Sequence, residues 1–101
     1  MDLLDLAAVT SETFAASIGQ TFEAVFTDGR LPLTLAEVRP LGSARLPGTR
    51  APFALTFHGR VGLRLPQHIY RLENATLGAM EVFLVQSAGD ATASQFEAVF
   101  N

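Results

Sequence analysis

The chain has 101 residues, of which 49% are hydrophobic and 17% charged, and its formal net charge is -3 at pH 7. This length fits a single domain over residues 1–101, and the apolar composition excludes a largely disordered chain. The negative charge speaks against nucleic-acid binding, which requires clustered positive charge. Cysteine is absent, which excludes disulfides and cysteine zinc sites.

The N-terminal stretch MDLLDLAAVT carries Asp2 and Asp5 and no basic residue, so it lacks the charge pattern of a secretory signal. No apolar run approaches the ~18 residues that a membrane span requires. We therefore expect a protein without membrane contacts, either cytoplasmic or incorporated into a particle or appendage assembled from the cytoplasm.

The segment VTSETFAASIG predicts a helix over about residues 10–18. Thr10 can act as its N-cap, and Val9 and Phe14 occupy the positions of a hydrophobic staple. Phe14 and Ile18 lie four residues apart, so both would face the rest of the protein. A helix of about two turns depends on this packing for its stability. We expect it to cover one end of a sheet.

From residue 20 onward the hydrophobic period changes to two, which is typical of strands. The pattern predicts six strands, over about residues 20–27, 31–39, 52–59, 67–73, 79–86 and 95–100. We expect a mainly β fold, a small six-stranded antiparallel barrel with one short N-terminal α-helix. The predicted core consists of Phe14, Ile18, Phe22, Phe26, Leu33, Leu35, Phe53, Leu55, Phe57, Leu72, Phe83, Val85, Phe96 and Phe100.

The strand AMEVFLVQ, residues 79–86, is apolar on both faces. This pattern is typical of a strand that is covered on both sides. We expect it to lie centrally, with the N-terminal helix on one face or a partner subunit on the other. Phe83 and Val85 are assigned to the core on this basis.

The motif FEAVF occurs twice, at residues 22–26 and 96–100. A duplicated unit is poorly supported, because TDGRLPLTL after the first copy has no counterpart after the second. We expect the two strands to direct phenylalanines into one core and to pair or lie close, which would remove two sheet edges. Glu23 and Glu97 point outward at equivalent positions, and we expect them to be offset or solvated because directly opposed like charges are unfavourable.

The sequence shows no nucleophile motif, and its serines lie in cap or loop contexts. His58 and His68 with Glu73 or Glu81 would complete a two-histidine, one-carboxylate metal set. The favoured interpretation is a surface His58 and a hydrogen-bonded His68 beside Tyr70. These groups are also too few for acid–base catalysis. We expect no catalytic residue, metal or cofactor.

The longest connection, RPLGSARLPGTRAP at residues 39–52, places three arginines on an otherwise acidic protein. Such a loop can contact a carboxylate, a phosphate or an acidic partner surface, although a solvated hairpin loop is the favoured interpretation. If the loop is functional, it would form a site together with His68 and Tyr70 at the barrel mouth. The candidate partner- or ligand-binding residues are Arg39, Arg45, Arg50, His68 and Tyr70.

The succession LTLAEVRPLG, PFALTFHG, LPQHIYRLEN, LGAMEVFLV and FEAVFN, over roughly residues 33–101, resembles a bacterial family of short single-domain proteins known as a domain of unknown function. The resemblance implies genes located near tail-fibre-like proteins that carry a phage tail collar domain. It implies a role in a phage-tail-like or surface appendage assembly, and it implies no activity.

These observations favour a non-enzymatic structural or protein-interaction module that self-associates or docks on a protein partner such as a tail-fibre-like protein. The alternative is a barrel that binds a small ligand or glycan through the arginine loop and the barrel mouth.

Overall fold

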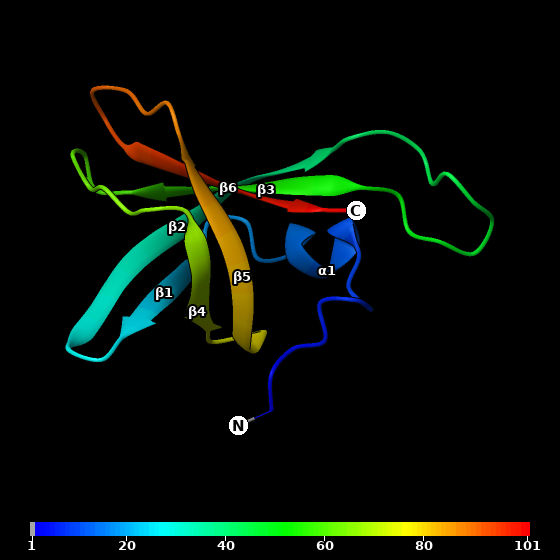
Figure 1. The fold of residues 1–101 in the computed structure, drawn as a ribbon, viewed down its shortest axis with the longest axis horizontal. Helices are drawn as coiled ribbons and strands as arrows, with labels where there is room; N and C mark the ends of the chain where they lie inside the picture. Colours follow the sequence, from blue (N-terminus) through cyan, green and yellow to red (C-terminus); the bar gives the residue numbers. More distant parts are fainter. Residues whose placement is uncertain (1) are drawn as a thin grey trace.

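The computed structural model describes residues 2–101 and contains one short helix and six strands. Their bounds are α1 Ser11–Ala15, β1 Thr21–Phe26, β2 Gly29–Pro40, β3 Phe53–Gly59, β4 His68–Asn74, β5 Gly78–Ser87 and β6 Ser94–Phe100. The strands form a closed antiparallel barrel in the order β1-β2-β3-β6-β5-β4 (Figure 1). The predicted fold class is therefore confirmed.

Both FEAVF segments direct phenylalanine into one core, as predicted. Phe22 and Phe96 are fully buried, Phe100 is 6% exposed, and Phe26 packs against the core from its edge. The predicted pairing of the two segments is wrong, because β1 lies between β2 and β4 whereas β6 lies between β3 and β5. The repeat therefore places phenylalanines on opposite walls of the barrel.

The helix is shorter than predicted, since it ends at Ala15 instead of near residue 18. Thr10 is its N-cap residue, and the predicted staple residues Val9 and Phe14 both belong to the core. The prediction for Ile18 is wrong, because this side chain is 49% exposed. Once the helix has ended, residue 18 no longer shares a helical face with Phe14.

A β-bulge changes the direction of side chains in β2. The β2–β3 register shifts between Leu35 and Glu37, so Val38 stands opposite Leu55 and turns toward the core. The chain that leaves α1 joins β2 at the same place, where the N–H of Gly19 donates to the carbonyl of Leu35 at 2.7 Å. The bulge thus fixes α1 beside β2.

The strand buried on both faces is β3, where residues 53–57 are all buried. Its outward residues Ala54 and Thr56 are small, and they stand opposite Arg39 and Glu97 respectively. The guanidinium of Arg39 donates to the Glu97 carboxylate at 3.0 Å. This ion pair crosses over β3 and shields its outer face.

The assignment of Phe83 and Val85 to the core is wrong, and α1 packs against β2 instead of covering β5, while cover by a partner subunit stays a prediction. Met80, Val82 and Leu84 point into the barrel, while Phe83 is 52% and Val85 39% exposed. The interior of a barrel accepts one face of each strand, and α1 packs beside β2. Phe83 and Val85 consequently lie on the outer wall.

The connections gather at two opposite ends of the barrel (Figure 1). The arginine-rich loop, residues 41–52, projects from one end together with α1 and the C-terminal residues of β6. The β3–β4 connection, residues 60–67, and the β5–β6 connection, residues 88–93, lie at the other end. Any site formed by loops therefore belongs to one end or the other.

Candidate functional site

The five residues predicted to form one site lie at different places. His68 begins β4 at the end opposite the arginine-rich loop, so the structure does not bring the two parts of the predicted site together. The Tyr70 ring lies 5.6 Å from that of His68, edge to face. The Tyr70 hydroxyl donates to the carbonyl of Pro66, and burial raises its pKa. Tyr70 thus fastens the β3–β4 connection to β4.

Arg50 forms a clamp within the protein. Its Nε donates to the carbonyl of Asn101 at 2.9 Å, and one terminal nitrogen donates to the carbonyls of Leu6 at 2.6 Å and Val9 at 2.8 Å. The guanidinium carbon also lies 5.8 and 5.7 Å from the ring centroids of two core phenylalanines. Three of its five N–H donors are thus bound by the chain itself, so Arg50 is a poorer candidate for partner binding than an exposed arginine.

The other two arginines of the predicted set differ. Arg39 is paired with Glu97 across β3. Arg45 is exposed in the loop and lines a cavity of about 530 Å³ together with Thr49, Pro52 and Asn101. Arg45 is therefore the arginine of this set that remains accessible to a partner.

The outer wall over β4, β1 and β2 carries a network of charges. Glu23 stands directly opposite Glu73, a like-charged pair that would be unfavourable alone. Arg30 lies 2.8 Å from the Glu73 carboxylate and 3.6 Å from that of Glu23, and Arg71 lies 3.1 Å from Glu73. Hydrogen bonds from Arg30 and Arg71 lower the pKa of Glu73. This wall is electrostatically satisfied.

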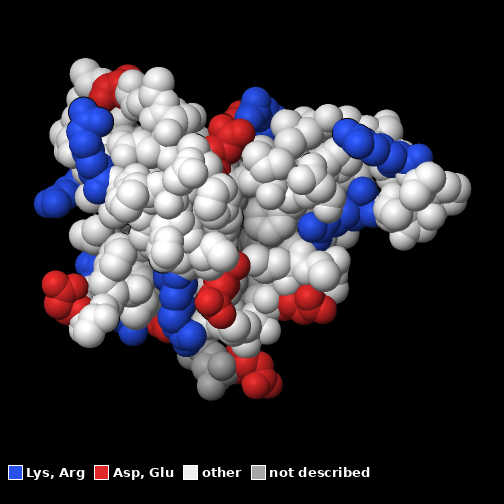
Figure 2. Space-filling model, in the orientation of Figure 1, with Lys and Arg blue, Asp and Glu red and all other residues white. Residues whose placement is uncertain are grey.

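The outer wall over β4, β5 and β6 is different, because four large apolar side chains are exposed there. The outer apolar patch consists of Ile69 (56% exposed), Phe83 (52%), Val85 (39%) and Val99 (55%). Ile69 stands opposite Phe83 in the β4–β5 register. Figure 2 shows a largely uncharged surface over β5 with charged side chains around it.

A groove of about 380 Å³ crosses this patch between Phe83, Val85 and Val99, with Ser87 and Glu97 at its border. The four side chains expose on the order of 300 Å² of apolar surface, which lies in the range of the largest patch on a typical monomer. Patches of this kind are often functional. The outer apolar patch is therefore the leading candidate site.

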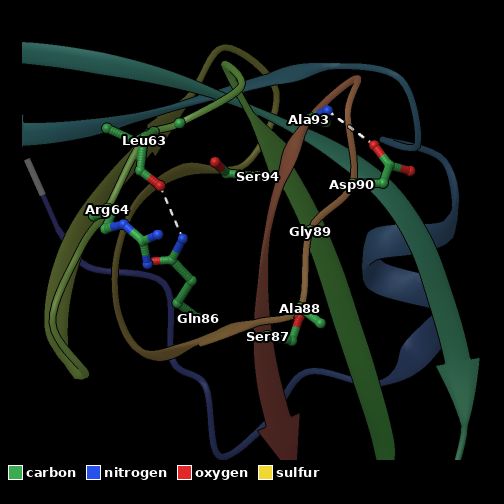
Figure 3. A pocket seen from close by; sticks show the side chains of 10 residues that line it. Leu63, Arg64, Gln86, Ser87, Ala88, Gly89, Asp90, Ala93 and Ser94 are labelled. Atoms are coloured by element: carbon green, nitrogen blue, oxygen red, sulfur yellow. Dashed lines mark hydrogen bonds between the residues drawn. The ribbon is translucent and has the colours of Figure 1, made fainter.

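A second candidate, the end pocket, lies between the two connections at the end opposite α1. It has a volume of about 520 Å³, and its polar lining includes Arg64, Gln86, Asp90 and Ser94 (Figure 3). The Gln86 side-chain amide donates to the carbonyl of Leu63 at 2.8 Å and accepts from the N–H of Leu65 at 3.0 Å. These bonds hold the β3–β4 connection against β5.

One oxygen of the Asp90 carboxylate, Oδ1, is also occupied. It accepts hydrogen bonds from the N–H and hydroxyl of Thr92 and from the N–H of Ala93, and these bonds lower its pKa. Arg64 forms no ion pair within residues 2–101. The end pocket therefore offers one accessible cation, while its amide and carboxylate stabilise the loops.

Two further findings concern classes of site. Within residues 2–101, no group of three or more histidine, cysteine, aspartate or glutamate side chains is arranged to hold a metal ion. None of the helices in this range has the length and apolar character that a bilayer crossing requires.

The protein is a small closed antiparallel barrel with one short helix, α1, and an apolar outer wall over β4, β5 and β6. The chain belongs to the family described as Domain of unknown function (DUF6916), whose model matches residues 9–100. The resemblance noted from the strand segments is confirmed at that level. Neither a curated protein nor a solved structure matched the chain.

Sequence reasoning missed the outer apolar patch as a site, although the signal was present. In a barrel with one interior face per strand, a strand that is apolar on both faces must expose one of them. Ile69 and Val99 carried a second signal, because each alternates with residues that point inward on its own strand.

Proposed function

We propose that this domain is a non-enzymatic structural or protein-interaction module that contacts its partner through the outer apolar patch. The observation that carries the proposal is the exposure of Ile69, Phe83, Val85 and Val99 side by side on the β4–β5–β6 wall. The opposite wall, over β1, is covered by paired charges. The barrel is therefore apolar on one side and polar on the other.

The size of the patch limits the kind of complex. Burying about 300 Å² at about 25 cal/mol per Å² gains roughly 7 kcal/mol. Association itself costs on the order of 4–15 kcal/mol. The patch alone supports a weak contact, so a stable complex must also use the polar rim or repeat the contact within an assembly.

The family resemblance supports a finer proposal. The domain is an accessory of a bacterial phage-tail-like or surface appendage assembly, and a tail-fibre-like protein is its partner. On this proposal the domain resides in the cytoplasm or in a particle assembled from it. An assembly with many copies would compensate for a weak individual contact, because linked contacts raise overall affinity.

The test compares two double variants. Phe83→Ser with Val99→Ser removes the patch, and Leu46→Ser with Val61→Ser is the matched control, because these two side chains are 66% and 58% exposed elsewhere. Self-association is measured by light scattering, and binding by co-purification with the neighbouring tail-fibre-like protein. We expect association at least tenfold weaker than wild type for the Phe83→Ser, Val99→Ser variant, and unchanged association for the control variant. Equal loss in both variants, or in neither, would refute the proposal.

The alternative function, a small-ligand or glycan-binding barrel, has one observation in its favour, which is the end pocket of about 520 Å³ with its accessible Arg64. This pocket replaces the predicted combination of the arginine loop with His68 and Tyr70. A glycan array compares the wild type with Arg64→Ala. Binding that disappears in the variant would support this function, and an array without signal would remove it.

A further inference from the structure

The barrel is closed along part of the boundary between β5 and β6. The β5–β6 register covers Val85 to Ser87 on β5 and Gln95 to Glu97 on β6. β5 begins at Gly78 and β6 continues to Phe100, so the first part of β5 and the last part of β6 diverge. We name this divergent boundary, between residues 81–83 and 98–100, the seam.

Backbone groups face into the seam from both strands. The N–H of Leu4 donates to the carbonyl of Ala79 at 2.8 Å from outside the β4–β5 pair. Alternate residues of a strand direct their N–H and C=O groups to the same side, so Glu81 and Phe83 face the seam as well. The same alternation continues through the paired Val85 and Glu97 and places the backbone groups of Val99 on the seam.

These groups have no strand partner in the described chain. The β5–β6 register ends at Val85, and within residues 2–101 no backbone hydrogen bond from a turn or loop reaches Glu81, Phe83 or Val99. An unpaired strand edge is a template for another extended chain. The seam is thus a short free edge inside an otherwise closed barrel.

The protein already adds an extended segment to this edge. Leu3 forms a parallel bridge with Ala79, next to the Leu4 hydrogen bond. Within the described residues the N-terminal segment forms no bridge beyond Leu3, so the edge at Glu81 and Phe83 has no paired strand, although Leu6 lines the cavity beside it. A strand from another protein would continue along the same edge of β5, which already accepts β pairing at Ala79.

The space and chemistry beside the seam suit a single extended peptide. A cavity of about 200 Å³ lies between Phe83 and Val99, with Leu6 and Arg50 among its lining residues. It adjoins the groove of about 380 Å³ on the outer apolar patch, which shares Phe83 and Val99. Alternate side chains of an added strand would enter this groove.

The charges beside the seam define the peptide further. Glu81 is exposed and forms no ion pair within residues 2–101. Glu97 also borders the groove, but its carboxylate is paired with Arg39 at 3.0 Å, so Glu81 supplies the unpaired negative charge. A basic residue on the added strand would therefore meet negative charge at the rim.

We propose that the seam binds an extended segment of another protein by β-strand addition, and that this segment has alternating apolar residues and at least one basic residue. This inference rests on the proposed function as an interaction module and specifies the partner and the binding mode. The backbone groups of Glu81, Phe83 and Val99 supply the pairing, while the outer apolar patch selects the side chains.

The experiment selects short random peptides from a displayed library against the whole domain and maps the selected peptides by NMR. We expect sequences with alternating apolar residues and a basic residue. Binding should slow the exchange of the Glu81, Phe83 and Val99 amide protons. Affinity should fall roughly tenfold in Glu81→Pro, which removes one seam N–H and leaves the β4–β5 ladder intact. Glu81→Ala is the matched control, because it keeps the N–H.

Each outcome separates the two proposals. Peptides that contact Phe83 and Val99 side chains without protecting the seam amides would overturn strand addition and leave the interaction module standing. An unsuccessful selection, or binding at the end pocket alone, would overturn strand addition, while the association of the Phe83→Ser, Val99→Ser variant decides separately on the interaction module. Amide protection that appears with rising protein concentration alone would identify a second copy as the occupant and overturn the peptide proposal. If Glu81→Pro does not fold, Val99→Pro and the amide exchange of the wild type decide the question.

Discussion

Replacing Arg50 by alanine should destabilise the domain strongly, although this residue lies at the edge of an exposed loop. Arg50 donates three hydrogen bonds, to the carbonyls of Leu6, Val9 and Asn101. Its guanidinium also stacks against the rings of Phe53 and Phe100, which are themselves stacked at 4.8 Å. The side chain therefore joins the N-terminal segment, β3 and the end of the chain.

The magnitude follows from these contacts. A hydrogen bond to a charged group contributes about 1.5–3 kcal/mol when buried, and we take about 1 kcal/mol for each because Arg50 is half-buried. The cation–π contacts add about 0.5–1 kcal/mol. We expect Arg50→Ala to lower the free energy of unfolding by about 3.5–4 kcal/mol, which corresponds to about 14–20 °C in melting temperature for a domain of this size.

Urea denaturation and thermal melting measure the effect. Arg50→Lys should lose about half as much stability, because lysine keeps the charge but not the planar fork. Arg45→Ala is the control and should stay within about 0.5 kcal/mol. A loss below about 1 kcal/mol in Arg50→Ala would show that the clamp is not structural and would return Arg50 to the candidate binding residues.

Three further predictions concern the two faces of the strands, the charged wall and the close packing at Gly59. Phe96→Ala should cost about 3–5 kcal/mol in unfolding free energy, whereas Phe83→Ala should cost under about 0.5 kcal/mol, and equal losses by urea denaturation would contradict the inward and outward assignments. Arg30→Gln should raise the pKa of Glu73 in an NMR titration, because it removes the first of the two arginine hydrogen bonds that lower it. Since the folded pKa is lowered, this carboxylate stabilises the fold above the ordinary glutamate pKa of about 4.3, and the contribution is lost as pH falls through the folded value; an unchanged titration in the variant would remove Arg30 as the cause. Gly59→Ala should destabilise the domain by about 1–3 kcal/mol, because the new Cβ would lie 2.9 Å from a Leu63 methyl carbon. A variant that melts at the wild-type temperature would show that the Leu63 side chain moves aside without cost.

The positions of the strands could be predicted from the sequence because side chains alternate with period two along a half-buried strand. Their spatial order could not be predicted, because β1 and β6 carry the same FEAVF pattern. Both strands place phenylalanines in the core, from opposite walls of the barrel. The bulge between Leu35 and Glu37 left a weak signal, because the apolar positions change there from odd-numbered Leu33 and Leu35 to even-numbered Val38.

The candidate site was predicted least well, for two physical reasons. A strand that is apolar on both faces, such as AMEVFLVQ, fits the core in either orientation, so its sequence does not decide whether Phe83 or Val82 points inward. Arg50 binds backbone carbonyls, and backbone acceptors have no sequence pattern that would identify them as its partners.

Hydrogen exchange of single amides in the free domain tests the central claim most directly. Val82 and Ala98 belong to the paired sides of β5 and β6, toward β4 and β3, whereas the N–H groups of Phe83 and Val99 face the seam. We expect Phe83 and Val99 to exchange at least about a hundredfold faster than Val82 and Ala98, because a free edge leaves its N–H groups open to water. Equal protection of all four amides would show that the seam is closed and that the β4–β5–β6 wall has no edge to offer a partner strand.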